Sequence, residues 1–414
     1  MKILYALHQY YPEYQAGTEK FVYNMASMSE LNANKVKIVT YRLGDFNHSP
    51  KGAEGIQYEE YFHNKLPVVA FQYNARPVDL NFGFDNALGL AFARDILKKE
   101  IPDILHIGHM MRVFPFAQAA IELDIPFVIT LTDFFMICPR NTLAPTPNSL
   151  CNGPKGGEAC AKYCPAFSQA YIQERLTQAK SILQKAAKIF APSRFVAQMV
   201  EAEVDGIEVI VNHHGIRQSQ IRANTRHYDQ DSQLNFAFIG TLSNHKGTHL
   251  AIQAFEKVNT EKASLSVYGS GEEDYVKWLK RLAGKSQMRF LGSFPSEDLA
   301  KIFSTIDVLI VPSIVYETYS FVVHEALACE VPVIVSNLGG MVEQIEDELN
   351  SFLFPPGDVQ ALSEIMQSIV DNPDSLNEIK AQIRKTTLVP SIEQEAYRYG
   401  RAYKQAIEVG VTED

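Results

Sequence analysis

In this chain of 414 residues, the clearest candidates for binding or catalytic chemistry are two glutamates eight residues apart, Glu317 and Glu325. Glu317 follows a strand-like run that ends at Pro312, and Glu325 lies in a helix-length segment before a second run, Val331–Ser336. In a parallel sheet, ligands bind beyond the carboxyl ends of the strands. A carboxylate there can accept charge-assisted hydrogen bonds from sugar or ribose hydroxyls. The alternative is a solvated helix residue beside an unrelated loop acid.

Three glycine-bearing loops follow predicted strands, at Ala16–Glu19, Gly240–Gly247 and Gly339–Gly340. Glycine lets backbone N–H groups approach an anion, and a helix N-terminus adds a favourable dipole. Lys246 contributes a positive charge. Each loop alone could be an ordinary turn, but three of them, spread over both halves of the chain, indicate a ligand held between two domains.

Strand-like and helix-like segments alternate along the chain, and the alternation occurs twice. The runs Ile3–Leu7 and Val36–Tyr41 flank the helix-length segment Lys20–Leu31, and a fresh series begins at Phe236–Ile239. This pattern predicts an α/β fold of two doubly wound, Rossmann-like domains. We place the first domain at residues 1–200, the second at 201–388 and a C-terminal helix at 389–414, with a cysteine-rich loop at 133–167.

The charge and the hydrophobicity of the chain argue against some classes of protein, namely nucleic-acid-binding and membrane-spanning proteins. The net charge is −10, and the first 190 residues hold 19 Lys and Arg against 17 Asp and Glu, so the acidic excess lies later in the chain. An acidic total disfavours nucleic acid as a partner. Because no apolar run approaches the roughly 18–20 residues of a membrane span, we expect a cytoplasmic protein. The nearly neutral first half leaves peripheral contact at the inner face of the membrane open.

Four of the five cysteines lie in one loop, at Cys138, Cys151, Cys160 and Cys164. In a cytosolic chain, clustered cysteines are more typical of metal ligation than of disulfides, and four thiolates suit tetrahedral Zn²⁺. We therefore predict a structural zinc site in this loop. Disulfides, an iron–sulfur cluster and free thiols remain alternatives, because the spacing lacks a paired C-x2-C. Cys329 is expected to be simply buried.

Taken in order, these motifs resemble the retaining glycosyltransferases of family 4, also called group 1 glycosyltransferases, which have the GT-B fold of two Rossmann-like domains facing a deep cleft. The resemblance covers nearly the whole chain. The segments that carry it are Tyr11–Glu19, Pro102–His106, Ala191–Ser193, Gly240–Gly247, Pro312–Glu317, Glu325–Ala328 and Pro332–Val333.

The resemblance implies a nucleotide-sugar donor, UDP- or GDP-linked, bound mainly by the second domain. Glu317 would bind sugar hydroxyls, Glu325 the ribose, and Lys246 the pyrophosphate. The implied donor-binding residues are Gly17, Gly240, Thr241, Lys246, Gly269, Gly271, Leu291, Glu317, Ser320 and Glu325. Retaining members are described as using front-face attack without a catalytic metal, so the enzyme positions the reactants and stabilises the charge of the leaving phosphate.

The first domain is implied to bind the acceptor. Its candidate residues are His8, Tyr11, His106, His109 and Asp133. His109 is the favoured member, because it lies nearest the loop, and it joins Glu317 and Lys246 as the predicted catalytic residues. A packed structural role is the usual alternative for a histidine at a strand end.

The chain departs from the family pattern at five positions, one of which is Thr132, where the family has a histidine before Asp133. Thr241 replaces the usual arginine, which removes one cationic phosphate partner. Ala16, His214 and Glu330 replace a glycine, an asparagine and a glycine. None of these changes removes a glutamate of the pair.

These expectations predict retaining transfer of a sugar from a nucleotide-sugar to a hydroxyl of a glycan or glycolipid, as in polysaccharide biosynthesis. The alternatives are a non-catalytic GT-B subunit that binds a nucleotide or sugar, which the missing arginine keeps open, and a GT-B nucleotide-sugar epimerase. A phosphorylase would need a pyridoxal phosphate lysine, which no segment suggests. A dinucleotide oxidoreductase would need a G-x-G-x-x-G after the first strand, which the chain lacks. The oligomeric state is not determined by the sequence.

Overall fold

The computed structural model describes residues 1–46, 49–52, 55–84, 86–146, 149–259, 261–284, 286–343, 345–387 and 389–411. The chain divides into two compact units. Unit 1 comprises Met1–Pro145, Cys151–His214 and Ile392–Asp414, and unit 2 comprises Thr146–Leu150 and Gly215–Ser391. The predicted domain limit at residue 388 and the last three residues of the predicted tail lie outside the described residues.

Unit 1 is built on an eight-stranded sheet with the order β3-β4-β2-β1-β5-β6-β7-β8. All neighbouring pairs are parallel except β3 and β4, which form an antiparallel hairpin. The central strands are short, apolar and buried on both faces, as parallel strands covered by helices are. The strands are β1 (Lys2–Leu7), β2 (Lys35–Tyr41), β3 (Ile56–His63), β4 (Leu66–Tyr73), β5 (Ile104–Ile107), β6 (Phe127–Thr130), β7 (Lys188–Ala191) and β8 (Val209–Val211).

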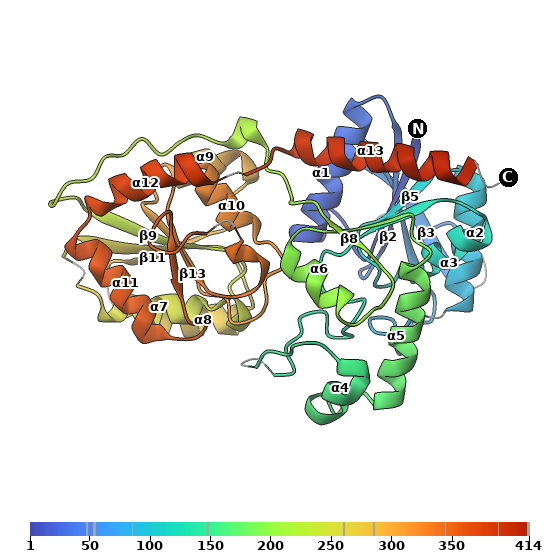
Figure 1. Ribbon diagram of the computed structural model, residues 1–414, viewed down its shortest axis with the longest axis horizontal. Helices are drawn as coiled ribbons and strands as arrows, with labels where there is room; N and C mark the ends of the chain where they lie inside the picture. The colour runs from blue at the N-terminus through green and yellow to red at the C-terminus, as the bar shows by residue number, and fades with distance from the viewer. Residues whose placement is uncertain are drawn as a thin grey trace. The chain divides into compact units, whose positions relative to one another are not determined.

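The helices of unit 1 come both from the crossovers and from the end of the chain. The C-terminal helix packs beside the first helix, and the second packs beside the third (Figure 1). A buried tyrosine of the C-terminal helix, Tyr403, contacts Tyr5 of β1 at 3.3 Å between hydroxyl oxygens, which ties this helix to the sheet. The helices are α1 (Gly17–Leu31), α2 (Ala87–Glu100), α3 (Phe114–Glu122), α4 (Glu158–Tyr163), α5 (Gln169–Leu183), α6 (Arg194–Glu201) and α13 (Ile392–Val411).

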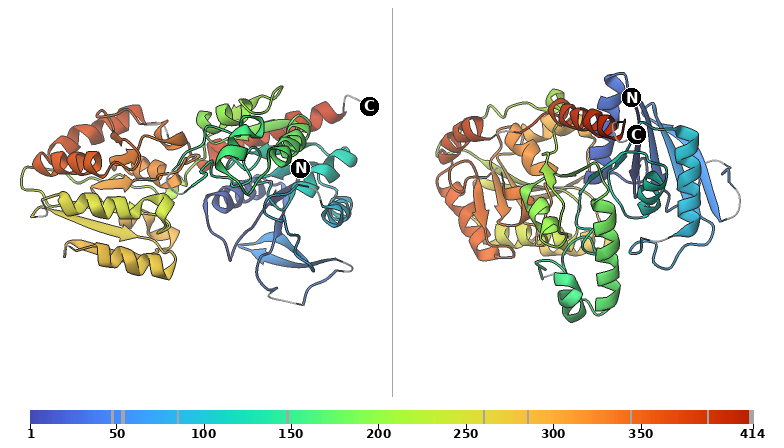
Figure 2. Two further views of the ribbon diagram at one scale, coloured as in Figure 1. Left: turned by 90° about the horizontal axis from the view of Figure 1, so that it is seen from below. Right: turned by 45° about the vertical axis from the view of Figure 1, so that its right-hand side comes forward.

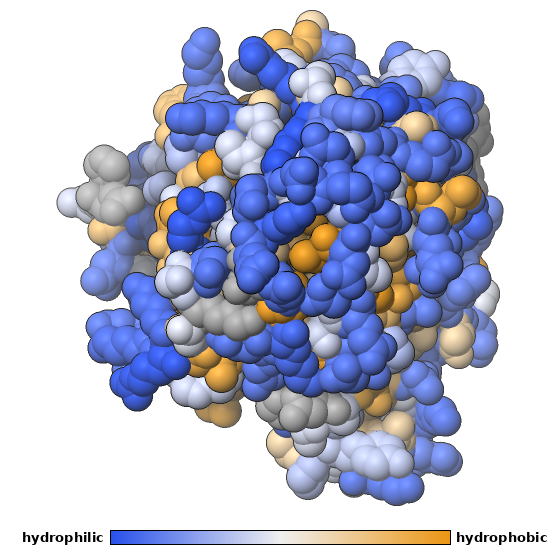
Figure 3. All heavy atoms as spheres, turned by 90° about the vertical axis from the view of Figure 1, so that its left-hand side faces the viewer, coloured by the Kyte–Doolittle hydropathy of each residue, from blue (hydrophilic) through white to orange (hydrophobic). Residues whose placement is uncertain are grey.

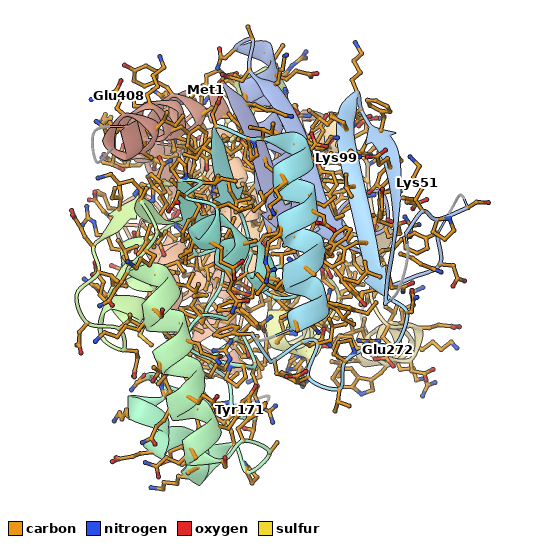
Figure 4. The ribbon with its side chains drawn as sticks, turned by 90° about the vertical axis from the view of Figure 1, so that its right-hand side faces the viewer. Met1, Lys51, Lys99, Tyr171, Glu272 and Glu408 are labelled. Atoms are coloured by element: carbon orange, nitrogen blue, oxygen red, sulfur yellow. The ribbon has the colours of Figure 1, made fainter. Side chains whose placement is uncertain are left out.

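The edge strand β3 of this sheet carries charged side chains that form ion pairs. Glu60 of β3 pairs with both Lys51 and Lys99, each at 3.1 Å; the two lysines are labelled at this side of unit 1 in Figure 4. These two partners outweigh the effect of burial and lower the pKa of Glu60, with Lys99 contributing most. Charged side chains on an edge strand discourage pairing with another chain.

Unit 2 has a six-stranded, wholly parallel sheet with the order β11-β10-β9-β12-β13-β14. Helices cover both faces, α7, α8 and α11 on one and α9, α10 and α12 on the other (Figures 1 and 2). The strands are β9 (Leu234–Ile239), β10 (Ala263–Tyr268), β11 (Met288–Gly292), β12 (Val308–Val311), β13 (Val333–Ser336) and β14 (Phe352–Phe354). The helices are α7 (Thr248–Lys257), α8 (Glu273–Leu282), α9 (Leu299–Phe303), α10 (Phe321–Ala328), α11 (Val359–Asp371) and α12 (Ser375–Thr386).

The predicted α/β fold of two doubly wound, Rossmann-like domains is confirmed, but several elements were assigned wrongly or missed. The strand Val209–Val211 lies within the range 201–388 that was predicted for the second domain, whereas it pairs in parallel with β7 and belongs to unit 1. The hairpin β3–β4 and the helices α3, α6 and α12 were not predicted. The sheet that a strand joins depends on which sheet edge is free to pair with it, and the sequence of the strand itself does not contain that information.

The surface offers no membrane-spanning element in the part of the chain that the structure describes: none of its helices combines the length and the apolar character that crossing a bilayer requires. On the face drawn in Figure 3, hydrophilic side chains predominate, and apolar ones gather only in small patches.

Candidate functional site

The strand order of unit 2 reverses at β9, which lies between β10 and β12. The loops that follow β9 and β12 therefore start side by side at the carboxyl edge of the sheet, where open α/β sheets bind ligands. The loop after β9 carries Lys246 in a short 3-10 turn, Asn244–Lys246. The loop after β12 carries Glu317, and the two side chains meet although they are 71 residues apart.

Lys246 and Glu317 form a two-point ion pair. Lys246 Nζ lies 2.7 Å from Glu317 Oε1 and 3.0 Å from Oε2. Ser313 Oγ also donates to Oε1, at 2.6 Å. Burial by itself would raise the pKa of Glu317, but the charge and hydrogen bonds of Lys246, followed by the Ser313 hydroxyl, outweigh it and lower that pKa. Glu317 is therefore an ionised carboxylate with only 12% of its side chain exposed.

Two glycines let the loops approach this closely. Gly247 has φ +71°, and a Cβ there would stand 1.8 Å from the carbonyl oxygen of Pro312. Gly339 has φ +70°, and a Cβ there would stand 2.5 Å from the carbonyl oxygen of Glu317. The following amide, Gly340 N, donates to that same oxygen at 2.7 Å. Only glycine combines the left-handed backbone with such a close approach, so both loops are held against the Glu317 segment.

The other predicted donor residues of unit 2 lie at the same sheet edge. Leu242 N donates to Ser270 O at 2.8 Å, which joins the predicted segments 240–242 and 269–271 in a parallel bridge. Thr241 is exposed there, and Leu291, near the end of β11, is 47% exposed. Ser320 caps α10 in a left-handed conformation, with φ +63°, and Glu325 lies buried in that helix. Gly17, by contrast, opens α1 of unit 1.

Unit 1 has its own switch point, because β1 lies between β2 and β5. His109, just after β5, holds Asp133 at 2.7 Å through Nε2 and accepts a hydrogen bond from Met111 N at Nδ1, at 3.1 Å. With Nδ1 occupied as an acceptor, the ring proton lies on Nε2 and is donated to Asp133. Both nitrogens are thus engaged, and Asp133, with 24% of its side chain exposed against 3% for His109, is the member that a ligand can reach.

Two more buried titratable groups adjoin this pair. The His8 ring packs on the His109 ring, with centroids 4.0 Å apart, and His8 Nε2 lies 3.6 Å from Glu19 Oε1. Burial is the largest cause that lowers the pKa of His8 well below its ordinary value. Burial also raises the pKa of Glu19, although a hydrogen bond from Ala16 N opposes this. Perturbed groups gathered at a sheet switch point are typical of functional sites.

The acceptor-side prediction for His106 is wrong. This side chain is completely buried, and its ring nitrogens bind Tyr403 Oη at 2.6 Å and Thr130 Oγ1 at 2.8 Å. Burial lowers the pKa of His106 to about 3, which keeps the ring neutral. Successive side chains in a strand point to opposite faces, and His106 points into the core under α13. Tyr11, another candidate, stacks on His63 with ring centroids 4.7 Å apart.

The zinc prediction is not supported. The four loop cysteines do line one small cavity, yet among the described residues no group of three or more His, Cys, Asp and Glu side chains has an arrangement that could hold a metal ion. All four are free thiols. Burial raises the pKa of Cys138 and of Cys151, and it raises the pKa of Cys160 to about 12. Cys151 Sγ instead donates to Gly153 O at 3.2 Å. Burial therefore favours the protonated form of these three thiols.

Two residues of these sites were missed from the sequence. Ser313 was noted only as part of a motif, yet it donates directly to Glu317. Arg112 was not considered, although it lies three residues after His109 and its guanidinium donates to the carbonyl oxygen of His8 at 3.2 Å. Its spacing from His109 was the one available signal, and that spacing corresponds to no known motif.

Comparison with known proteins identifies what this architecture resembles. Residues 219–386 match the family described as Glycosyl transferases group 1. An uncharacterized glycosyltransferase of Methanocaldococcus jannaschii is 24% identical over 360 residues, which cover 86% of this chain and 85% of that protein. O-antigen chain mannosyltransferase B of Escherichia coli is 33% identical over 150 residues, which cover 34% of this chain and 38% of that protein.

Solved structures share the whole fold. Anabaena HepE, in complex with UDP and glucose, superposes with a TM-score of 0.70 at 18% identity, covering 98% of this chain and 100% of that one. Sucrose-phosphate synthase from Thermosynechococcus elongatus gives a TM-score of 0.69 at 16% identity, with 99% and 100% covered. At these identities the likeness establishes the GT-B fold.

Proposed function

Because the chain belongs to the group 1 glycosyltransferases through residues 219–386, we propose that it transfers a sugar, with retention of anomeric configuration, from a UDP-linked donor to a hydroxyl group of a glycan or glycolipid. The observation that carries the proposal is the Lys246–Glu317 pair at the carboxyl edge of the unit 2 sheet. The choice of UDP over GDP is supported by HepE, a protein of the same fold that was solved with UDP and with UDP-glucose.

Glu317 suits recognition of the transferred sugar. It is ionised and mostly buried, and a carboxylate accepts only, so it binds hydroxyl groups that donate. Lys246 and Ser313 already hold Oε1, which fixes the orientation of the carboxylate before a ligand arrives. A group that is held in place beforehand needs no reorganisation during the reaction.

Lys246 suits the leaving group. Its ammonium is a third exposed, so it can contact a pyrophosphate while it remains paired with Glu317. Negative charge develops on the leaving phosphate as the glycosidic bond breaks, and a nearby cation lowers the energy of that state. In front-face transfer the same phosphate takes the acceptor proton. Thr241, where the family has an arginine, leaves Lys246 as the one cation that we assign to this task.

On the acceptor side we propose that Asp133, oriented by His109, contacts the attacking hydroxyl. The shift of role from His109 to Asp133 follows from the use of both imidazole nitrogens in the observed hydrogen bonds. Gly17 at the start of α1 would add backbone N–H groups toward the donor phosphates, since a helix N-terminus favours anions.

The test combines binding and turnover. Thermal unfolding would be followed with UDP, GDP and ADP and with their common sugar conjugates, because a ligand that binds the native state raises the melting temperature by mass action. Release of free nucleotide would report turnover. We expect UDP to stand out among the nucleotides and one UDP-sugar to be consumed, and product NMR would show the retained anomeric configuration.

Glu317→Gln is the decisive variant, and Glu297→Gln, at an exposed position of the same unit, is its matched control. We expect Glu317→Gln to lower turnover by about 10²–10³-fold with little change in UDP affinity, because removal of one such interaction costs that much. Turnover equal to that of the control would remove Glu317 from the donor site. Nucleotide binding without any turnover of the wild type would favour the non-catalytic subunit that Thr241 suggests, and conversion of the sugar without an acceptor would favour an epimerase.

A further inference from the structure

A groove with a cavity volume of about 350 Å³ opens on unit 1 beside the His109–Asp133 pair. It is lined by Asn81, Phe82, Met111, Arg112, Arg140 and Asn141, among others. Two of these lining residues contact the acceptor-side candidates, since Met111 N donates to His109 and Arg112 donates to the carbonyl oxygen of His8. The volume falls within the range of small-molecule sites, which is about 300–1,000 Å³.

The charge of the groove is opposite to that of the chain. The protein carries a net charge of −10, yet among the described residues two arginines and no aspartate or glutamate line this groove. Asn81 and Asn141 add amide groups, and Phe82, which is 38% exposed, adds apolar surface. Apolar surface with a few convergent polar groups is the usual composition of a ligand site.

The hydrogen bonds that the Arg112 guanidinium makes to the described residues all go to neutral oxygens, and it also lies 5.9 Å from the centroid of the Tyr41 ring. Its Nε donates to Asn81 Oδ1 at 2.8 Å, and its Nη1 lies 3.2 Å from His8 O and 3.5 Å from Gln9 Oε1. Across the described residues, its Nη2 makes no hydrogen bond and none of its nitrogens forms an ion pair. Glu19 acts on it only at longer range. A partly buried cation that lacks a carboxylate partner is costly unless an anion completes it.

The backbone conformation of Arg112 and the charge near its guanidinium both bear on anion binding. Its backbone is left-handed, with φ +66°, a conformation that costs a residue other than glycine free energy and persists only where the surrounding structure holds it. Burial, and then the positive charge of Arg76, lowers the pKa of Arg112. A second cation near the first makes the local field still more favourable for an anion.

The buried side chain of Arg175 joins two segments that lead to the groove. Arg175 Nε donates to Phe82 O and Nη1 to Met136 O, each at 3.1 Å. Its guanidinium packs between the rings of Phe84 and Phe135, at 4.2 Å and 4.6 Å from their centroids. The segment that carries Asn81 and the loop that leads to Arg140 therefore form one preorganised support, which reduces the entropy lost on binding.

We propose that this groove binds an anionic group of the acceptor, a phosphate or a carboxylate attached to a sugar, through Arg112 and Arg140. The inference rests on the proposed function, because it assigns the chemical class of the acceptor whose hydroxyl would meet Asp133. The planar guanidinium suits both anions, since its N–H groups match two oxygens of a carboxylate or a phosphate. Phe82 would contact the apolar face of the sugar ring.

Binding to the full chain, measured by calorimetry at low ionic strength, tests this without an active donor. The probes are glucuronic acid, glucose 6-phosphate and, as the neutral match, glucose. We expect at least one of the two acids to bind at least tenfold more tightly than glucose, and to weaken as salt is added. Binding of glucose 6-phosphate alone would identify phosphate as the recognised group, and binding of glucuronic acid alone would identify carboxylate.

Arginine variants distinguish binding in the groove from a general effect of removing positive charge from the protein. Arg112→Gln and Arg140→Gln should each lower the affinity for the acid by at least tenfold, whereas Arg401→Gln, which removes an exposed arginine of α13 in the same unit, should not. Arg140 is exposed, so its replacement tests the groove even where Arg112→Gln fails to fold. Equal binding of acids and glucose, or full affinity in Arg140→Gln and in folded Arg112→Gln, would overturn the proposal.

UDP binding by the same preparation distinguishes the two levels of inference. If UDP binds and no acid does, the anionic acceptor is refuted and the glycosyltransferase proposal stands. If the acids bind through Arg112 and UDP does not, the groove stands as an anion site, and its assignment to an acceptor fails together with the proposed function.

Discussion

His106 should make the stability of unit 1 depend on pH in a measurable way. Replacement of His106 by glutamine removes a titratable group that is fully buried between Tyr403 and Thr130. In the folded protein the pKa of His106 is lowered from the ordinary 6.5 to about 3, because burial disfavours the charged ring. The unfolded chain binds a proton near pH 6.5, and the folded chain does not.

The direction and the size of the effect follow from that difference. Stability rises with pH wherever the unfolded state binds more protons, so the contribution of neutral His106 is complete above pH 6.5 and is lost as the pH falls toward 3. At 1.36 kcal/mol per pKa unit, the loss reaches roughly 2 kcal/mol between pH 8 and pH 5. The glutamine variant lacks this loss, although it starts less stable by about 1–3 kcal/mol, because buried hydrogen-bonding groups lose their partner.

Urea unfolding at pH 8 and pH 5 measures the difference. Far-UV circular dichroism follows both units, and fluorescence of Trp278, the single tryptophan, follows unit 2 as an internal reference. The free energy of unfolding of the wild type should fall by about 2 kcal/mol more than that of His106→Gln in the unit 1 transition. Buried His8 contributes to both proteins and cancels. Parallel pH dependences of the two proteins would refute the reasoning that places a neutral imidazole under α13.

Three further predictions concern the loops, the acceptor pair and the thiols. Gly292→Ala, at φ +74° with nothing within 4 Å of the added Cβ, should destabilise unit 2 by about 1–2 kcal/mol. Gly247→Ala meets a backbone oxygen at 1.8 Å and should cost at least ~2 kcal/mol more; equal losses by Trp278 fluorescence would contradict the close approach. Asp133→Asn should lower transfer about 10²-fold, because the acceptor hydroxyl would be misplaced, without altering UDP affinity, whereas unchanged transfer would exclude Asp133 from the acceptor site. When the protein is unfolded without prior reduction, all five cysteines should react with a thiol reagent. The zinc released on unfolding should amount to well below one ion per chain, and about one ion per chain would show that the loop binds metal.

The sequence predicted the parts of the site that depend on local order. Glu317 and Lys246 were both assigned from motifs, because a loop after a parallel strand places its side chains at the ligand-binding edge wherever that strand lies in the sheet. The direct contact between them was not predicted. It requires β9 and β12 to be neighbours, and strand order is a property of the whole sheet.

The first domain shows the opposite balance. His106 and His109 have the same residue type, lie three positions apart and were both proposed for the acceptor side. Burial separates them completely, since His106 lies under α13 and His109 contacts Asp133. The C-terminal helix that covers His106 begins almost 290 residues later in the chain, so no local pattern could distinguish the two histidines.

The sequence by itself determined the α/β class, the two doubly wound units, the glycine loops and the carboxylate at the strand end, because backbone periodicity, glycine conformation and motif order are properties of neighbouring residues. Only the tertiary structure decided that β8 joins unit 1, that Ser313 and Lys246 fix Glu317, that Asp133 is the reachable member of its pair, and that Arg112 and Arg140 line one groove. Those outcomes depend on which distant segments pack together and on how much water they exclude, and both are set by the complete fold.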